Sequence, residues 1–120
     1  TSEFNDLTNN DMHVIEAIGI EEPKNMSTIA KELSVTVGTL TIAMNSLVKK
    51  GYVTRQRGKE DRRVVYIFLS EKGRAAYEHH ARFHKDMIDG VIGQLSGDEV
   101  EALIKALTKL NTWFRSLEEN

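Results

Sequence analysis

The sequence predicts an α+β fold that is mainly α-helical, and three observations lead to this prediction. Two helical patterns separated by about three residues occur near the start, a pair of short β-branched stretches follows them at once, and two long segments with apolar helical stripes end the chain. A chain of 120 residues has room for one domain with a helical extension. Its 40% hydrophobic and 28% charged residues are typical of a globular protein.

The first helix is expected to begin at Thr8, because Thr8-Asn9-Asn10-Asp11 resembles a capping box. The apolar residues Met12, Ile15 and Ile18 then follow at helical spacing, and Gly19 can end the helix. Pro23 separates this helix from the rest of the chain.

Two further helices form a helix-turn-helix pattern. Ser27 is expected to cap a short helix through Leu33, and Thr36 to cap a second helix that ends at Lys49-Lys50-Gly51. The second helix has a stripe of apolar residues that would face inward, namely Leu40, Ala43, Met44, Leu47 and Val48.

A β-hairpin is predicted directly after these helices. Tyr52-Val53-Thr54-Arg55 is β-branched and aromatic, the stretch from Gly58 to Asp61 is polar and suits a turn, and Val64 to Leu69 predicts the second strand. A hairpin with a basic tip after a helix-turn-helix is a wing, so the predicted domain is a winged helix-turn-helix.

The pattern returns to helix from Ser70, and the sequence Ser96-Gly97-Asp98-Glu99 opens a final helix. We expect a winged helix-turn-helix body over residues 8–74 and two long C-terminal helices over residues 70–118. The stripe of the final helix is near-heptad and wide enough to pair with a second subunit, which predicts a homodimer built on these dimerisation helices. The stripes are Phe83, Met87, Ile88, Val91, Ile92 and Leu95 in the first helix, and Val100, Leu103, Ile104, Leu107, Leu110, Phe114 and Leu117 in the second.

Composition excludes several kinds of protein. The chain has no cysteine, which excludes disulfides and thiolate metal sites and fits a reducing compartment, so we expect the cytoplasm. The longest apolar runs are too short to span a bilayer, and no basic and apolar leader opens the sequence, so neither membrane insertion nor export is expected. The first residue is Thr1, which indicates that the natural N-terminus lies upstream.

Charge is distributed unevenly along the chain. The net charge is −2, but residues 24–74 hold eleven Lys or Arg against four Asp or Glu, whereas the flanks hold five basic and fourteen acidic residues. A basic centre is what a surface that meets phosphates requires. A merely solvated charged face is the alternative that charge by itself leaves open.

The second helix of the helix-turn-helix is expected to enter the major groove of double-stranded DNA. Asn45 can pair bidentately with adenine, and threonine methyl groups can contact thymine. An exposed helix position without any role is the alternative for each threonine. The outward residues are Thr36, Val37, Gly38, Thr39, Thr41, Ile42 and Asn45.

The exposed face of this helix holds few charges, so most of the affinity for DNA must come from phosphate contacts made elsewhere. These contacts are expected from the basic residues around the helix and on the wing. An arginine on a narrow hairpin can enter the minor groove of A·T-rich DNA. Asp61 is expected to hold one wing arginine by a bidentate pair and so stabilise the loop; a hairpin charged only for solubility is the alternative. The basic residues are Lys31, Lys49, Lys50, Arg55, Lys59, Arg62 and Arg63.

Two motifs resemble the MarR family of bacterial regulators. Asp61, Arg63, Leu69, Ser70 and Gly73 stand at the spacing D-x-R-x5-L-[ST]-x-x-G of that family's wing, and the stretch from Leu47 to Arg55 is similar to its joint between helix and wing. The resemblance covers the chain from about Thr8 to the C-terminus. It implies a dimeric DNA-binding repressor on a pseudo-palindromic operator.

Three shorter stretches resemble one branch of that family, which represses fatty-acid synthesis genes in Gram-positive bacteria. They are Val35 to Thr41, Asp61 to Val65 and Arg82 to Lys85. The branch implies an acylated acyl carrier protein or a long acyl chain as effector. The resemblance also implies a further long helix before the one containing Met12, where this sequence has only Thr1 to Leu7.

The histidines suggest an effector crevice rather than a metal site. His80 and His84 are four residues apart, but a zinc site needs further convergent ligands and no spacing supplies them, so no metal and no cofactor is expected. The crevice would lie between the long helix and the body; histidines buried in a core or interface are the alternative. Its expected lining is His13, Phe83, His84 and Met87.

An enzyme is not expected, since the sequence has no Gly-rich phosphate loop, no G-x-S-x-G elbow and no H-E-x-x-H motif. Two alternatives remain at this point: a MarR-type regulator of another regulon, with a small aromatic or lipophilic effector or a role in stress, and a winged helix used only for protein contacts. Binding that weakens steeply with salt would separate DNA recognition from the second alternative.

Overall fold

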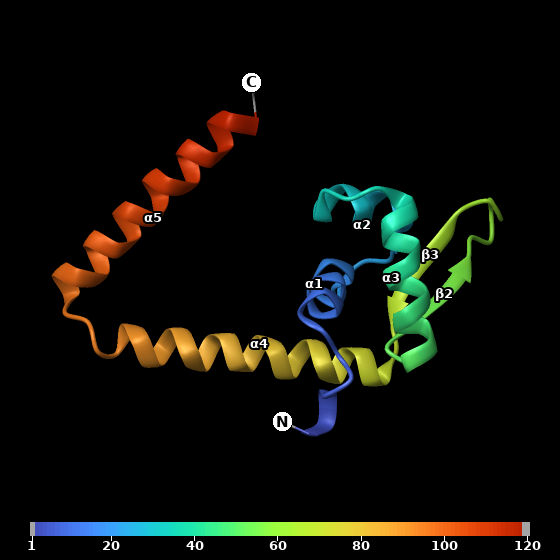
Figure 1. Ribbon diagram of the computed structural model, residues 1–120, viewed down its shortest axis with the longest axis horizontal. Helices are drawn as coiled ribbons and strands as arrows, with labels where there is room; N and C mark the ends of the chain where they lie inside the picture. Colours follow the sequence, from blue (N-terminus) through green and yellow to red (C-terminus); the bar gives the residue numbers. More distant parts are fainter. Residues whose placement is uncertain (1, 119–120) are drawn as a thin grey trace. The chain divides into compact units, whose positions relative to one another are not determined.

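The computed structural model describes residues 2–118 and confirms the predicted α+β class (Figure 1). The described residues form two compact units that divide after Ala81. None of the described helices is long and apolar enough to cross a membrane. In chain order the elements are a 3-10 helix Ser2–Phe4, α1 Asn9–Ile18, β1 Lys24–Asn25, α2 Met26–Leu33, α3 Val37–Lys50, β2 Val53–Arg57, β3 Val65–Leu69, α4 Glu71–Ile92 and α5 Gly97–Glu118.

The core of the first unit lies where α1, α2 and α3 meet the sheet. Each helix turns a stripe of aliphatic residues inward, and each such side chain contributes about 1.5–3 kcal/mol when it is fully buried. The largest of the fully buried side chains are Tyr52, Ile15, Ile18, Ile29, Leu40, Met44, Leu47 and Ile67. Leu40, Met44 and Leu47 therefore fix which face of α3 is left for solvent.

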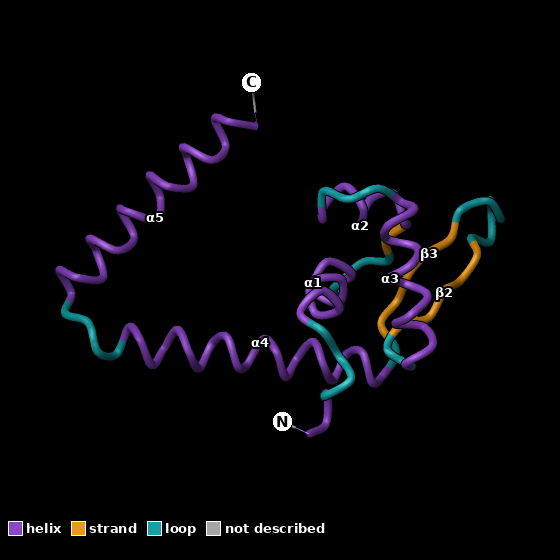
Figure 2. The backbone as a smooth tube through the Cα atoms, in the orientation of Figure 1, coloured by secondary structure: helices purple, strands orange, loops and turns teal. Residues whose placement is uncertain are grey.

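The sheet has three antiparallel strands in the order β1-β3-β2. In the hairpin Val53 faces Leu69 and Arg57 faces Val65, so β2 extends two residues further than its sequence pattern predicts. β1 was not predicted, because two residues that pair Lys24 with Ile67 show no strand pattern. Figure 2 shows β2 and β3 leading to the loop that forms the tip of the wing.

Most helix ends follow the capping residues. Thr8 and Asp11 form the predicted capping box at the start of α1, Thr36 caps α3, and α3 ends at Gly51. The prediction that Ser27 caps α2 was wrong. The cap is Asn25, whose side-chain oxygen accepts a hydrogen bond from Thr28 N at 2.8 Å, because β1 brings Asn25 to the helix end in extended conformation.

The second unit holds the later part of α4 and all of α5. α5 begins with a capping pair, in which Ser96 N donates to Glu99 Oε1 at 3.0 Å and Glu99 N to Ser96 Oγ at 3.2 Å. No residue of α5 is buried. Its apolar stripe is therefore open to solvent in the single chain, at Leu103, Ile104, Leu107, Leu110, Trp113, Phe114 and Leu117.

Candidate nucleic-acid interface

Helix α3 presents one row of side chains to solvent opposite its buried stripe. Ile42 is the most exposed large apolar residue of this row, with 75% of its surface accessible, and Val37 is 44% exposed. Asn45 is also exposed. This row, with apolar and polar side chains together, is the face of α3 that a partner could contact.

The two threonines of α3 and the threonine that caps it differ in what their hydroxyls can still do. Thr36 Oγ1 accepts from Thr39 N at 3.1 Å and donates to Thr39 Oγ1 at 3.0 Å, while Thr41 Oγ1 donates to Val37 O at 2.8 Å. The hydroxyl protons of Thr36 and Thr41 are thus used inside the helix. Thr39 Oγ1 acts as an acceptor in its contact with Thr36, which leaves its own proton available, whereas Thr36 caps the first turn of α3.

The wing tip is built around Asp61. Arg63 Nε lies 3.1 Å from Asp61 Oδ1 and Arg63 Nη2 lies 3.3 Å from Asp61 Oδ2, so the pair is bidentate. A further hydrogen bond runs from Arg63 N to Asp61 Oδ1 at 3.0 Å. The side-chain hydrogen bond from Arg63 is the largest cause that lowers the pKa of Asp61. The Arg63 side chain remains 93% exposed, so it is oriented and still available to a partner.

Two residues that were not among the predicted site residues shape the same loop. Arg57 Nη1 donates to the Arg62 carbonyl at 3.3 Å and so joins β2 to the tip. Gly58 sits where a Cβ would lie 2.6 Å from the Asp61 carbonyl oxygen, which leaves room only for glycine. Arg57 lies two residues after Arg55 on the same strand, and the two-residue strand period could have identified it.

The basic residues predicted to meet phosphates fall into two groups. Those on α2, the end of α3, β2 and the wing tip are exposed, and they are Lys31, Lys49, Arg55, Lys59, Arg62 and Arg63. Lys50 differs from them, because its side chain is only 27% exposed and its ammonium group is bound within the protein.

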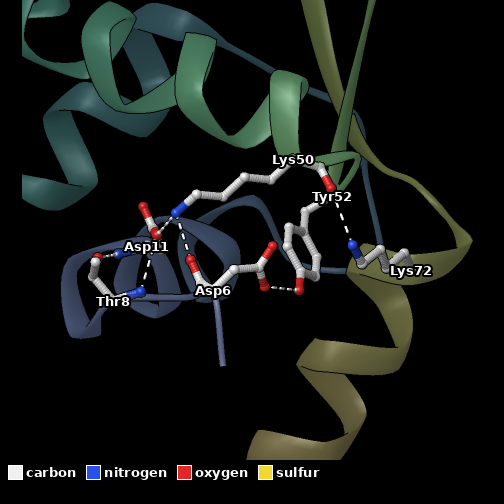
Figure 3. A network of polar contacts seen from close by, with 6 residues as sticks. All are labelled: Asp6, Thr8, Asp11, Lys50, Tyr52 and Lys72. Atoms are coloured by element: carbon white, nitrogen blue, oxygen red, sulfur yellow. Dashed lines mark hydrogen bonds and ion pairs between the residues drawn. The ribbon is translucent and has the colours of Figure 1, made fainter. Parts of the chain in front are cut away.

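Figure 3 shows the polar cluster around Lys50. Lys50 Nζ donates to Asp11 Oδ2 at 2.9 Å and to the Asp6 carbonyl at 2.5 Å, and Tyr52 Oη donates to Asp6 Oδ1 at 2.6 Å. Lys72 Nζ donates to the Lys50 carbonyl at 3.1 Å and lies 4.5 Å from the centre of the Tyr52 ring. The cluster thus joins the segment before α1, the end of α3, the start of β2 and the start of α4.

The ionisation of the cluster follows from these contacts. Burial raises the pKa of Tyr52 to about 12, and its hydrogen bond to Asp6 adds to the effect. Burial also raises the pKa of Asp11, but the hydrogen bonds from the Thr8 backbone and from Lys50 outweigh it, so the pKa lies below its usual value. The hydrogen bond from Tyr52 lowers the pKa of Asp6. At neutral pH Asp6 and Asp11 are therefore carboxylates and Tyr52 is a neutral phenol.

The residues expected to line an effector crevice belong to different units. His13 is on α1 and lines a surface pocket of about 330 Å³ together with residues of α2 and α3, including Thr39 and Ala43. Phe83 and Met87 lie in the second unit with 60% and 48% of their surface exposed, and the ring of His84 is 6.2 Å from that of Phe83.

His80 pairs with Glu16 of α1, with His80 Nε2 2.5 Å from Glu16 Oε1. This contact lies within the first unit. His84 follows His80 one turn later on α4. Sequence spacing showed the two histidines but could not show the carboxylate, because Glu16 reaches His80 from another helix.

Comparison with known proteins gives consistent results. A family model described as the MarR family matches residues 7–65. The crystal structure of Streptococcus pneumoniae FabT in complex with DNA is similar with a TM-score of 0.90 and 40% identity, over 95% of this chain and 80% of that chain. YwhA of Bacillus subtilis, an uncharacterised helix-turn-helix transcriptional regulator, is 35% identical over 82 residues, which are 68% of this chain and 59% of YwhA.

A second curated relative is the transcriptional regulator SarZ of Staphylococcus saprophyticus, which is 38% identical over 84 residues. The match covers 70% of this chain and 58% of SarZ. The chain thus spans about three fifths of the length of these curated relatives.

Proposed function

Because the chain belongs to the MarR family, we propose that it is a DNA-binding transcriptional regulator that acts as a homodimer on a pseudo-palindromic operator. The observation that carries this proposal is the solvent-exposed face of α3, with Ile42 at its centre and the basic wing beside it. Neither feature contributes to the core of the domain, and both suit double-stranded DNA.

The chemistry of each part fits a part of the duplex. Ile42 and the threonine methyls can contact thymine methyl groups in the major groove, and Asn45 can pair with adenine. Arg63, oriented by Asp61, can enter the minor groove next to α3, which is the recognition helix of the proposed complex. The exposed lysines and arginines on α2, α3 and β2 supply phosphate contacts, which fix the register without reading the sequence.

The homodimer is supported by the apolar stripe of α5. Seven large apolar side chains of that helix are 39–60% exposed in the single chain, which is far more than a monomer in water usually leaves contiguous. A two-fold axis between such helices would present two copies of α3 to successive turns of DNA. A dimer bound there would block access to the promoter and so repress transcription.

The regulon proposed is fatty-acid biosynthesis, with acylated acyl carrier protein as the effector. Support comes from the local resemblance of Val35 to Thr41, Asp61 to Val65 and Arg82 to Lys85 to that branch of the family. Phe83 and Met87 are exposed apolar residues on α4, as a wall for an acyl chain requires, and methionine adapts well to such a chain. His84, whose ring lies 6.2 Å from that of Phe83, is proposed to meet the polar end.

The test is a binding titration of labelled DNA from upstream of the source organism's fatty-acid synthesis genes. We expect operator binding at moderate salt, and a change of about 1–3 kcal/mol when long-chain acylated carrier protein is added. Equal affinity with acylated and unacylated carrier protein would reject the effector and the regulon. If the chain binds every tested promoter no more tightly than it binds a random duplex, the proposed regulon is rejected as well.

A further inference from the structure

The C-terminal end of α3 is held by contacts with a segment that precedes it by about forty residues. The Lys50 cluster, which consists of Asp6, Asp11, Lys50 and Tyr52, joins this end of the helix to the residues before and within the first turn of α1 (Figure 3). Thr8 completes the arrangement, because its hydroxyl accepts from Asp11 N at 3.0 Å while its own N–H donates to Asp11 Oδ2 at 3.0 Å. Asp11 is thereby fixed before Lys50 meets it.

The contacts of the Lys50 ammonium group within the protein are energetically preferred to a contact with a DNA phosphate. Its ammonium group satisfies a carboxylate whose side chain is only 8% exposed, and that carboxylate would lose its cation if Lys50 turned to a phosphate. Leaving a largely buried charge without its partner costs more than an exposed ion pair returns. Lys49, the next residue, is exposed, and no carboxylate of residues 2–118 forms an ion pair with it.

The same cluster is continuous with the start of α4. Lys72 donates to the carbonyl of Lys50, and Ser70 Oγ donates to the carbonyl of Gly51 at 2.6 Å. These carbonyls belong to the last turn and the cap of α3. The C-terminal end of α3 therefore has fixed partners both on the segment Asp6–Asp11 and at the start of α4.

We propose that the Lys50 cluster positions the C-terminal end of the recognition helix, and that Lys50 supports operator binding through Asp6 and Asp11 rather than through DNA phosphates. The inference rests on the proposed DNA-binding function. Lys50 is thus a positioning residue, and the segment Asp6–Asp11 becomes a place from which the orientation of α3 can be altered.

The test compares four variants of the full chain by the salt dependence of operator affinity. Each phosphate contact contributes about 0.9 to the slope of log affinity against log salt, so a contact present twice in a dimer contributes about 1.8. We expect Lys50→Met to weaken operator binding at least about fivefold with an unchanged slope. Lys49→Met removes the same charge from the same helix end and is the matched control, with an expected loss of slope of about 1.8.

Asp11→Asn gives the sharper distinction, because the two roles of Lys50 predict opposite signs. If Lys50 positions α3, the loss of the Asp11 charge weakens operator binding. If Lys50 contacts phosphate, the loss of a competing carboxylate strengthens binding and steepens the slope. A stronger Asp11→Asn complex, or a shallower slope for Lys50→Met, would overturn the proposal, and so would unchanged affinity in both variants.

Tyr52→Phe keeps the buried ring and removes only the hydrogen bond to Asp6, so it serves if the charge variants fail to fold. It is expected to weaken operator binding while leaving affinity for random duplex unchanged, since only register-dependent contacts need a positioned helix. Equal operator affinity for Tyr52→Phe and wild type would also overturn the proposal. Failure of the DNA-binding function itself is distinguishable, because the wild-type chain would then show no salt-dependent binding to any duplex.

Discussion

Gly73 offers a direct test of how α4 is joined to the winged domain. It is buried in the first turn of α4, where a Cβ would lie 2.0 Å from the Tyr52 carbonyl oxygen, 3.1 Å from its carbon and 3.2 Å from Leu69 Cβ. Two of these neighbours are backbone atoms, which cannot rotate away as the end of a flexible side chain would. In Gly73→Ala the first turn of α4 and the start of β2 must therefore move apart by about 1 Å or more.

The cost of this separation follows from what the contact holds. Forcing a methyl group into a filled site costs about 1–3 kcal/mol. The Tyr52 carbonyl also accepts a hydrogen bond from Ser70 N at 3.0 Å, and loss of such a bond costs about 0.5–1.5 kcal/mol. Gly73→Ala should thus destabilise the protein by about 2–4 kcal/mol, a large fraction of the 5–15 kcal/mol that is typical of folded domains.

Urea unfolding at one fixed protein concentration measures this loss, with the midpoint expected to fall by about 1–2 M. Gly38→Ala is the matched control, because its Cβ would meet only Thr36 Oγ1 at 3.9 Å within a helix. Without DNA present it should leave stability unchanged or raise it by up to about 1 kcal/mol. A Gly73→Ala protein within about 0.5 kcal/mol of wild type would refute this account of the joint.

Four further results are expected. Arg63→Ala should cost about 1–3 kcal/mol of operator affinity without unfolding the protein, and wild-type affinity in an anisotropy titration would reject its minor-groove role. Leu107→Glu should dissociate the dimer and abolish operator binding, whereas a monomeric wild-type chain at high micromolar concentration in sedimentation would contradict the dimer itself. Met87→Trp should remove the response to acylated carrier protein and spare basal DNA binding; a normal response would place the acyl chain elsewhere. The free energy of unfolding should fall by up to about 2–3 kcal/mol between pH 10 and pH 12, because the unfolded state loses the Tyr52 proton in this range while the folded state, with a Tyr52 pKa of about 12, retains it. Tyr52→Phe should lack this part of the pH dependence. An identical decline in both proteins would contradict the raised pKa of Tyr52.

The elements with local signals could be predicted from the sequence. Helix ends are marked by Thr8, Thr36 and Gly51 through hydrogen bonds made within a few residues of each. The strand pattern between Val53 and Leu69 needs only the pairing of two neighbouring segments in a hairpin. Ser27 was wrongly expected to cap α2, which Asn25 caps, and residues of both types are good capping residues. Only the pairing of Lys24 and Asn25 with β3, about forty residues away, decides between them.

The interface shows the same division. Exposure of Ile42 and Asn45 follows from the register of α3, which the apolar stripe already gives. The different position of Lys50 could not be predicted, since Lys49 and Lys50 are identical in kind and adjacent. What separates them is a contact with Asp6 and Asp11, and nothing in the local sequence places those acids beside the end of α3.

In the proposed complex a dimer places two copies of α3 and two wings on one face of an operator. Hydroxyl-radical footprinting of the wild-type chain on a bound promoter fragment tests this most directly. We expect two equivalent protected regions whose centres lie about one helical turn, or a whole number of turns, apart. We also expect flanking minor-groove protection that disappears in Arg63→Ala. A single protected region without two-fold symmetry, or a footprint unchanged by Arg63→Ala, would contradict this arrangement.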